Sequence, residues 1–326
     1  MTTTSAAARP SISSLYVLKA IGAFLVVACH TPFLWDVKEW SDPVHTMAVP
    51  LFFMISGYLL YAPEVEISEA RALKMIKKLI PIILIVNLIN YLWVLPNHGN
   101  VIDSWDKLMR LILLGGTISG HLWYLTALLE GMLLLYALLR WFRGWGISLL
   151  PLLLVLNLLV GRYHDALFSF DVSIALYSVI CYGLPFLALG YLIGRYRERL
   201  SGLHWQWISL ALLVLSYLEY ILFIGLESSG LGIYLMTAPL AMSLVMLALS
   251  YPTFGAGGVL ERIGLHHSGN IYYFHIMMAT ASIKLLGLLG LGGLYDPLGA
   301  VWAYVLTLLF SVVLRAVQSR LGLNIL

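Results

Sequence analysis

Long apolar runs recur along the whole chain and leave only short polar segments between them. Ten runs are long enough to predict helices, at residues 15–35, 48–62, 79–95, 118–139, 146–161, 172–193, 204–225, 231–251, 265–289 and 298–318. A membrane-spanning helix needs about 20 predominantly apolar residues. Only 11% of the residues are charged, whereas a soluble domain carries about 25%. The sequence therefore predicts a polytopic membrane protein and argues against a soluble enzyme, a disordered chain and a nucleic-acid-binding domain.

The fold class predicted from these runs is all-α. Backbone groups in lipid must find their hydrogen bonds within the protein, and the sequence lacks the alternating pattern of a membrane barrel. We therefore expect a bundle of about ten transmembrane helices, with residues 105–117 forming an amphipathic helix at the membrane surface. The loops are too short for a soluble domain, so we expect residues 1–326 to form one membrane-embedded domain with a flexible cytoplasmic segment at residues 1–12.

Basic residues in the loops predict the orientation of the bundle. With the N-terminus inside the cell, thirteen Lys and Arg residues fall in inside segments and four in outside segments. Cytoplasmic loops are enriched in these residues. The asymmetry predicts an even number of spans, two cytoplasmic termini and a multi-pass protein of the cell (inner, cytoplasmic) membrane.

Lys19 and His30 lie eleven residues apart in the first run. On a helix this spacing is about three turns, a rise of about 16 Å, and returns to nearly the same face. Ionisable groups in a membrane usually face the interior of a bundle. One interpretation is therefore a channel in which Lys19 binds an anionic group from the cytoplasm and His30 transfers protons. The alternative is that Lys19 extends to the lipid headgroups and His30 is hydrogen-bonded at the outer interface.

A cluster of basic residues precedes the third run. Lys74, Lys77 and Lys78 share one helical face at positions i, i+3 and i+4, close to Arg71 and before Pro81. This pattern is typical of the cytoplasmic anchoring of a membrane helix. It also fits a clamp for the phosphates of a nucleotide-bearing donor.

His121 and Trp123 open the fourth run at its outer end. Trp123 fits the aromatic belt that membrane proteins carry at the interface. His121 is expected at the same depth as His30, at the outer end of the first run. The two histidines are therefore candidates for one site.

Two further ionisable groups fall inside later runs. Glu130 lies about two turns deeper than His121 and needs a partner, for which Lys19, Lys284 or a histidine is available. His275 is expected in the inner half of the ninth run. A lone histidine in such a place is more often structural than catalytic.

Several common catalytic and metal-binding signatures are missing. The sequence contains no HExxH, paired CxxC, GxSxG or GxxxxGK[ST] pattern. Cys29 and Cys181 both lie in apolar runs and form no disulfide framework. We therefore expect neither a metal site nor serine-hydrolase chemistry.

Several motifs, taken in this order, resemble the integral-membrane acyltransferase family 3. A basic residue stands eleven positions before a histidine in LKAIGAFLVVACH, and VPLFFMISGY follows at 49–58. A basic cluster then leads to a proline, a His-x-Trp motif occupies 121–123, and LPFLALGYLIGR lies at 184–195. The series ends with SGNIYYFH at 268–275. Within the family, the chain is similar to the enterobacterial common antigen O-acetyltransferase type.

The resemblance implies an enzyme that takes an acyl group, usually acetyl from acetyl-CoA, in the cytoplasm. The group is transferred to a hydroxyl of a surface polysaccharide or its lipid-linked saccharide precursor. The resemblance also implies that His30 is the essential histidine and that Lys19 belongs to the donor site. Lys19 departs from the usual Arg, which removes a bidentate fork. Leu128 stands where many relatives carry a glutamate, with Glu130 two residues further on.

The resulting hypothesis is a membrane O-acetyltransferase that uses no metal. Three residues are candidate catalytic groups: His30, Lys19 and His121. Four are candidate contacts for acetyl-CoA: Lys19, Lys74, Lys77 and Lys78. Three are candidate accessory residues: Glu130, His275 and Trp123. The alternative is a transporter or flippase for a glycan or small anion, although no internal repeat typical of transporters is evident. A purely structural membrane protein is disfavoured because buried ionisable groups are costly.

Overall fold

The computed structural model describes residues 12–34, 38–164, 178–224, 232–323 and 325 of the chain. This part is built of helices and contains no strand, so the all-α prediction is confirmed. Apart from Ile12, the predicted flexible segment 1–12 lies outside the described residues.

The helices follow one another with short connections. In chain order they are α1 (Ser13–His30), α2 (Lys38–His45), α3 (Ala48–Leu60), α4 (Val65–His98), α5 (Trp105–Leu114), α6 (Trp123–Phe142), α7 (Leu154–Val160), α10 (Leu184–Leu200), α11 (Trp205–Ile224), α12 (Thr237–Ser250), α13 (Val259–His266), α14 (Ser268–Leu288) and α15 (Tyr295–Arg320). Three short 3₁₀ segments are η1 (Gly120–Leu122), η2 (Ile147–Leu153) and η4 (Gly292–Leu294). A π-helical turn, η3 (Val179–Gly183), leads into α10.

Eight segments of the described chain are long and apolar enough to cross a membrane. They are Ser13–His30, Ser41–Leu60, Val65–Pro96, Gly120–Phe142, Val179–Leu200, Trp205–Leu222, Ser268–Leu288 and Gly292–Arg320. Two shorter apolar segments, Ile147–Val160 and Thr237–Ser250, fall in the fifth and eighth predicted runs. All ten predicted runs therefore contain an apolar helix, and the protein is a polytopic membrane bundle.

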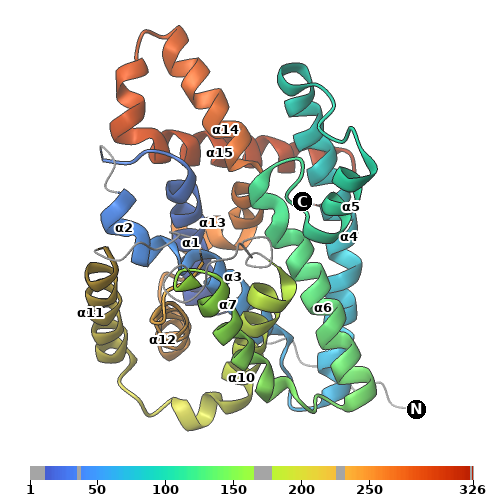
Figure 1. Ribbon diagram of the computed structural model, residues 1–326, viewed down its shortest axis with the longest axis vertical. Helices are drawn as coiled ribbons and strands as arrows, with labels where there is room; N and C mark the ends of the chain where they lie inside the picture. Colours follow the sequence, from blue (N-terminus) through green and yellow to red (C-terminus); the bar gives the residue numbers. More distant parts are fainter. Residues whose placement is uncertain (1–11, 35–37, 165–177, 225–231, 324, 326) are drawn as a thin grey trace.

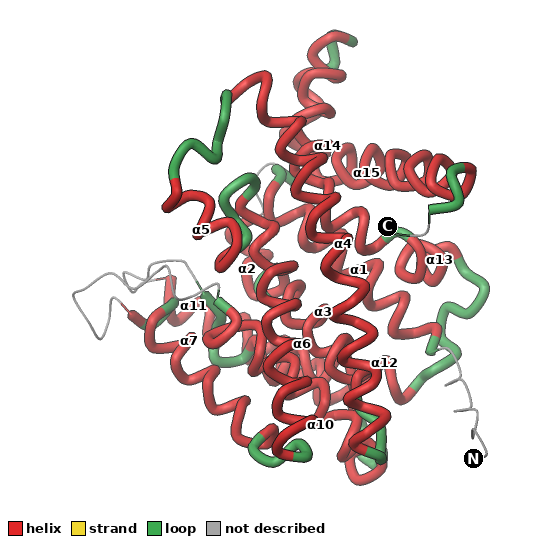
Figure 2. Tube along the Cα trace, turned by 90° about the vertical axis from the view of Figure 1, so that its right-hand side faces the viewer, coloured by secondary structure: helices red, strands yellow, loops and turns green. Residues whose placement is uncertain are grey.

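The first two long helices of the bundle lie at its centre. In Figure 1, α1 and α3 run through the middle, with α4 and α6 on one side and α11 and α12 on the other. Figure 2 shows α15 crossing the direction of the upright helices. α1 packs against α3, α12, α13, α14 and α15. Because helices surround α1 on several sides, polar groups on several of its faces lie in the protein interior.

Close packing of α3 against α10 depends on glycine. A Cβ atom on Gly57 of α3 would overlap the backbone of Leu187, and one on Gly190 of α10 would overlap the backbone of Met54. Small residues allow membrane helices to approach at backbone distance. Gly57, within the SGY motif, is therefore a close-packing site of α3 against α10.

Two helix boundaries differ from those predicted. α4 begins at Val65 and continues through Pro81, so the basic cluster and the third span belong to one helix. The ninth run is interrupted at His267, which ends α13 and precedes α14. Gly264 of α13 packs so closely on the backbone of Tyr16 that a Cβ would overlap it. This tertiary contact is invisible in the local hydropathy pattern.

The predicted amphipathic segment forms a separate helix, α5. Its first turn is capped by the Ser104 hydroxyl, which accepts from the backbone N–H of Lys107 at 3.3 Å. Gly115 ends the helix in the left-handed conformation, with φ of 76°. Trp105 is among its exposed large side chains. The helix is thus as predicted, and its place at the membrane surface stays a prediction.

Candidate active site

Two cavities lie along α1, and each contains one of the two polar residues singled out on that helix. Lys19 lines a cavity of about 230 Å³, called here the Lys19 cavity. His30 lines another of about 550 Å³, called here the His30 cavity. Neither side chain is therefore simply a lipid-facing group, although the two do not share one cavity.

The Lys19 cavity collects basic side chains from four helices. They are Lys19 of α1, Lys78 of α4, His266 of α13 and Arg315 of α15. Arg315 donates from Nη1 to the carbonyl oxygen of His266 at 3.1 Å, which connects α15 to α13. The described residues that line this cavity include no acidic side chain. The cavity is therefore electropositive and suited to an anion.

The predicted lysine cluster reaches this cavity only in part. Lys78 lines it, whereas Lys74 and Lys77 do not, and all three side chains are exposed on α4. Neighbouring residues on a helix are turned by about 100°. Lys77 therefore points away from the cavity that Lys78 lines. Lys74 lies one helical turn before Lys78. Sequence patterns do not single out His266 or Arg315, because both resemble ordinary residues of helix ends. The one signal is that Arg315 lies inside an apolar run.

The His30 cavity gathers side chains from segments that are far apart in the sequence. His30 is exposed at the C-terminal end of α1. His121 of η1 and Trp123 of α6 line the same cavity, together with Asp42 of α2 and Arg162, which follows α7. The structure thus brings His30 and His121 together, as their predicted depths indicated.

A third histidine joins this pair. The ring centroid of His275 lies 5.2 Å from that of His30 and 4.6 Å from that of His121. His275 is fully buried. Its contact with His30, at the far end of α1, corrects the expectation that His275 lies in the inner half of its span. The reason is that α14 starts only after the break at His267 and then packs along α1.

Hydrogen bonds fix the proton positions on two of these rings. His121 Nε2 lies 3.2 Å from the carbonyl oxygen of Tyr273, so it is the protonated nitrogen. The other nitrogen, Nδ1, accepts from the Ser119 hydroxyl at 3.0 Å. His275 Nδ1 donates to the carbonyl oxygen of Tyr272 at 2.8 Å. His275 Nε2 is buried and has no hydrogen-bond partner among the described residues.

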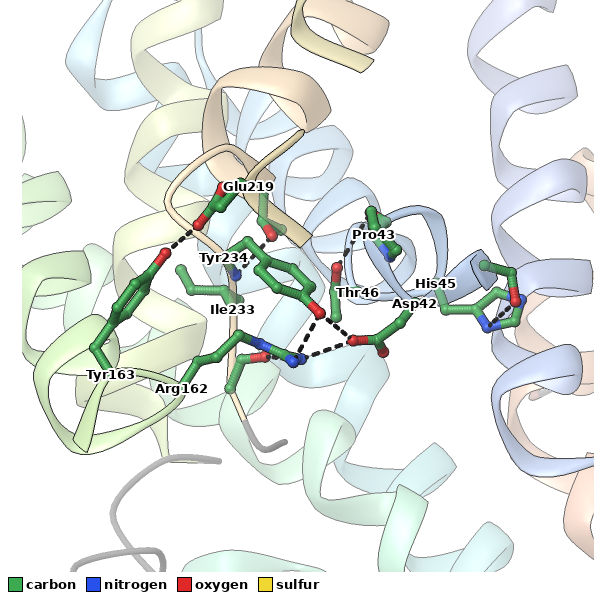
Figure 3. A network of polar contacts seen from close by, with 12 residues as sticks. Asp42, Pro43, His45, Thr46, Arg162, Tyr163, Glu219, Ile233 and Tyr234 are labelled. Carbon is green, nitrogen blue, oxygen red and sulfur yellow. Dashed lines mark hydrogen bonds and ion pairs between the residues drawn. The ribbon is translucent and has the colours of Figure 1, made fainter. Parts of the chain in front are cut away.

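A buried ion pair forms one wall of the His30 cavity (Figure 3). Arg162 Nη2 lies 3.0 Å from Asp42 Oδ2, and the Arg162 side chain is only 5% exposed. The Tyr234 hydroxyl donates to Asp42 at 2.5 Å and accepts from Arg162 Nη1 at 2.8 Å. Burial, reinforced by the Asp42 carboxylate, raises the pKa of Tyr234 well above its usual value. Tyr234 therefore keeps its proton and remains a donor to Asp42.

Sequence reasoning treats Arg162 only as one of the few basic residues outside the membrane. A single basic residue directly after an apolar run is the one sequence feature that could have marked Arg162 as a candidate. Nothing in the sequence pairs Arg162 with Asp42, 120 positions earlier. Pairing across that separation is set by the tertiary fold. The contact ties α2 to the segment that follows α7.

Glu219 of α11 is satisfied locally. It accepts from the Tyr163 hydroxyl (Figure 3). It also accepts from the backbone N–H groups of Leu235 at 2.7 Å and Met236 at 2.9 Å. These N–H groups precede α12. Glu219 therefore has a structural role in holding the start of α12 and lies outside the two cavities.

The accessory candidates Glu130 and Trp123 have different surroundings. Glu130 is half-buried on α6 and makes no hydrogen bond or ion pair with the described part of the chain, so the expected partnership with Lys19, Lys284 or a histidine does not form there. Glu130 also lines neither cavity. Trp123 lines both the His30 cavity and a groove of about 610 Å³ beside α5.

An aromatic layer separates the two cavities. Phe52, Tyr124 and Tyr272 line the Lys19 cavity, with ring centroids 4.9 to 6.3 Å apart. The Tyr272 hydroxyl donates to the backbone carbonyl of His121, and its ring centroid lies 6.0 Å from that of His275. The sequence predicts one passage from Lys19 to His30, whereas the structure has two cavities with this layer between them.

The described side chains include no group of three His, Cys, Asp or Glu residues placed to bind a metal ion. The clustered imidazoles of His30, His121 and His275 are groups that can act in acid–base chemistry. An imidazole beside a cavity can take a proton from a bound hydroxyl near neutral pH. A positively charged cavity on the other side of the aromatic layer adds a site for an anionic reactant.

These features define a polytopic membrane protein with the elements of a group-transfer enzyme in its interior. The family model for an acyltransferase domain, acyltransferase family 3, matches residues 12–316, nearly the whole chain. The chain belongs to this family. The family resemblance deduced from the motifs is thereby confirmed.

Two curated relatives show weaker similarity over part of the chain. A serine/alanine racemase of Enterococcus gallinarum is 34% identical over 131 residues, which cover 37% of this chain and 19% of the relative. An amino-acid racemase of Enterococcus faecalis is 28% identical over 192 residues, which cover 56% of this chain and 26% of the relative. The chain thus matches only a minor part of each of these longer proteins. No solved structure matches the chain.

Proposed function

We propose that this membrane acyltransferase is an O-acetyltransferase. It takes acetyl from cytoplasmic acetyl-CoA and transfers it to a hydroxyl of a surface polysaccharide or a lipid-linked saccharide precursor. The observation that carries the proposal is the pair of cavities along α1, one electropositive at Lys19 and one containing exposed His30. The family supplies the reaction class.

The charge of the Lys19 cavity supports acetyl-CoA as the donor. CoA carries several phosphates at one end of a long flexible arm, and basic groups without acidic neighbours attract such an anion. The cavity, about 230 Å³, is smaller than a whole CoA molecule. The arm therefore occupies the cavity beside Lys19 and Lys78, and the nucleotide stays outside it, where exposed Lys74 and Lys77 remain available.

The His30 cavity supports a neutral acceptor. Its one arginine, Arg162, is already paired with Asp42, and its other ionisable groups are mainly imidazoles. The ring of Trp123 offers a flat apolar face of the kind on which sugars stack. The basic-residue asymmetry of the loops supports an orientation with the Lys19 cavity toward the cytoplasm and the His30 cavity toward the outside.

In the proposed reaction His30 takes the proton of the acceptor hydroxyl. The hydroxyl oxygen forms a bond to the acetyl carbon, the carbon–sulfur bond breaks, and the CoA thiolate takes the proton from His30. The alternative route, in which His30 first carries the acetyl group itself, needs the same two cavities. In either route the aromatic layer of Phe52, Tyr124 and Tyr272 must open for the thioester.

A transporter or flippase is the second candidate. A transporter that works by alternating access opens first to one side of the membrane and then to the other. Two cavities with an aromatic layer between them are compatible with such a cycle. The family membership favours the enzyme, because the matching family model describes an acyltransferase domain.

The experiment that separates the two functions uses radiolabelled acetyl-CoA and sealed native membrane vesicles, which hold the cell's own acceptor. The enzyme produces label in ester linkage on the saccharide fraction, together with free CoA thiol. Label that accumulates inside the vesicles as intact acetyl-CoA, without thiol release, would overturn the proposed function and favour transport.

A further inference from the structure

The Nε2 atom of His275 is a buried polar atom without an assigned task. His275 is fully buried, and Nδ1 donates to the carbonyl oxygen of Tyr272 at 2.8 Å. A carbonyl oxygen only accepts, so the neutral ring carries its proton on Nδ1 and a lone pair on Nε2. Nε2 has no hydrogen-bond partner in the described part of the chain. An unsatisfied buried polar group destabilises the fold, so its retention calls for an explanation.

His121 cannot supply the partner for His30 that the depths of the two residues suggest. Its Nε2–H is committed to the Tyr273 carbonyl oxygen at 3.2 Å, and its Nδ1 to the Ser119 hydroxyl at 3.0 Å. Both nitrogens are therefore occupied. The ring also packs edge-on against His275, at a centroid distance of 4.6 Å, which holds His275 in place.

The position of His275 matches what His30 needs. The ring centroids of His275 and His30 are 5.2 Å apart, with the ring planes tilted by 34°. His275 lies on the buried side of the cluster, whereas His30 is exposed at the cavity. A lone pair on the buried side can receive one N–H of His30, which leaves the other nitrogen of His30 facing the cavity.

We propose that His275 is the positioning residue of His30: once the acceptor is bound, its Nε2, which lacks a partner in the described structure, accepts an N–H from His30 and fixes the tautomer whose unprotonated nitrogen faces the acceptor hydroxyl. This inference rests on the proposed function, because it assigns His30 the role of base. The inference assigns the orienting of His30 to His275 and not to His121. His121 then serves to hold His275.

The proton balance of the step is simple. The free nitrogen of His30 takes the acceptor proton, and the resulting imidazolium keeps its second N–H on His275 Nε2. His275 retains its own proton on Nδ1, bonded to Tyr272, and remains neutral throughout. The proton then leaves from the same nitrogen of His30 to the CoA thiolate. His275 therefore orients His30 and stabilises its charged form without losing or gaining a proton.

The test compares His275→Leu with His275→Gln in native membrane vesicles, using radiolabelled acetyl-CoA. We expect His275→Leu to lower kcat about 100-fold, as loss of an organised acid–base group does, with the acetyl-CoA KM changed less than about twofold, because the Lys19 cavity is untouched. We expect His275→Gln to recover about tenfold of that loss, because its amide oxygen lies near the place of Nε2 and can accept from His30. All rates are normalised to the monodisperse folded protein.

His164→Leu is the matched control, since His164 is another buried histidine that lines neither cavity. Wild-type kcat in His275→Leu would overturn the inference. Equal losses of kcat per folded protein in the Leu and Gln variants would also overturn it, because they indicate that His275 acts through packing and not through an acceptor atom at Nε2. If His30→Ala itself transfers acetyl normally, the proposed function fails, and that outcome is distinguishable from failure of the His275 role.

Discussion

The Lys19 cavity and the His30 cavity differ most in how their charges are balanced. Around Lys19, basic groups from α1, α4, α13 and α15 meet without an acidic side chain among the described lining residues. In the His30 cavity, Arg162 is matched by Asp42 at 3.0 Å. Unmatched charge is available to a charged ligand, whereas a buried matched pair stabilises the fold around it. This difference supports the proposal that the first cavity binds the donor and that the second performs chemistry on a neutral hydroxyl.

The largest expected effect lies in the His30 cavity. We expect His30→Ala to lower acetyl transfer about 10³-fold, because general acid–base catalysis contributes about 10²–10⁴. The measurement is label transferred from acetyl-CoA to the saccharide fraction of native membranes. His204→Ala is the control, since His204 is exposed ahead of α11. Comparable activity in the two variants would remove the distinction between the cavities.

The next effect concerns stability. Arg162→Met leaves the Asp42 carboxylate without its partner, and breaking a buried ion pair costs about 3–5 kcal/mol. We expect the lower part of this range, because Asp42 is 34% exposed. Thermal unfolding in detergent, followed by the loss of monodisperse protein, measures the change. Lys78→Met, in the Lys19 cavity, should shift the midpoint far less, and equal shifts would show that the charges of both cavities are structural.

A smaller effect is expected at Lys19. Lys19→Ala should raise the acetyl-CoA KM about tenfold, which corresponds to about 1.4 kcal/mol, with kcat little changed. Lys19→Arg should leave the acetyl-CoA KM near the wild-type value, because arginine keeps the positive charge at position 19. Steady-state kinetics at varied acetyl-CoA decides the matter, and an unchanged KM in the alanine variant counts against a donor site.

The smallest effect separates the lysines of α4. Lys78→Ala is expected to raise the acetyl-CoA KM about threefold, because Lys78 lines the cavity, and Lys74→Ala less than twofold, because surface ion pairs contribute about 0–1 kcal/mol. Raising the ionic strength should shrink the Lys74 effect first. The reverse order would indicate that the phosphates bind on the exposed face of α4.

The sequence could predict the architecture because hydropathy is a local property. Each predicted apolar run contains a helix, as expected. Helix boundaries could not be predicted where tertiary contacts decide them. The break at His267 follows from the approach of Gly264 to the backbone of Tyr16, and no local pattern shows it.

The sequence could predict which site residues share one helix, but it could not predict which residues of different helices come into contact. The eleven-residue spacing on α1 identifies Lys19 and His30, and depth alone suggests His121. The level of His275 is misjudged because it depends on where α14 starts relative to α1. Arg315 is missed because a basic residue near a helix end resembles an anchor.

The most direct test of the account measures donor binding and acetyl transfer separately in the Lys19→Ala and His30→Ala variants. Equilibrium binding of radiolabelled acetyl-CoA to purified protein gives the first quantity, and label on the saccharide fraction gives the second. We predict that His30→Ala binds acetyl-CoA with the wild-type Kd and transfers nothing. Lys19→Ala should bind it about tenfold more weakly yet still transfer at saturating donor. Weakened binding in His30→Ala together with wild-type binding in Lys19→Ala would contradict the division of labour between the two cavities.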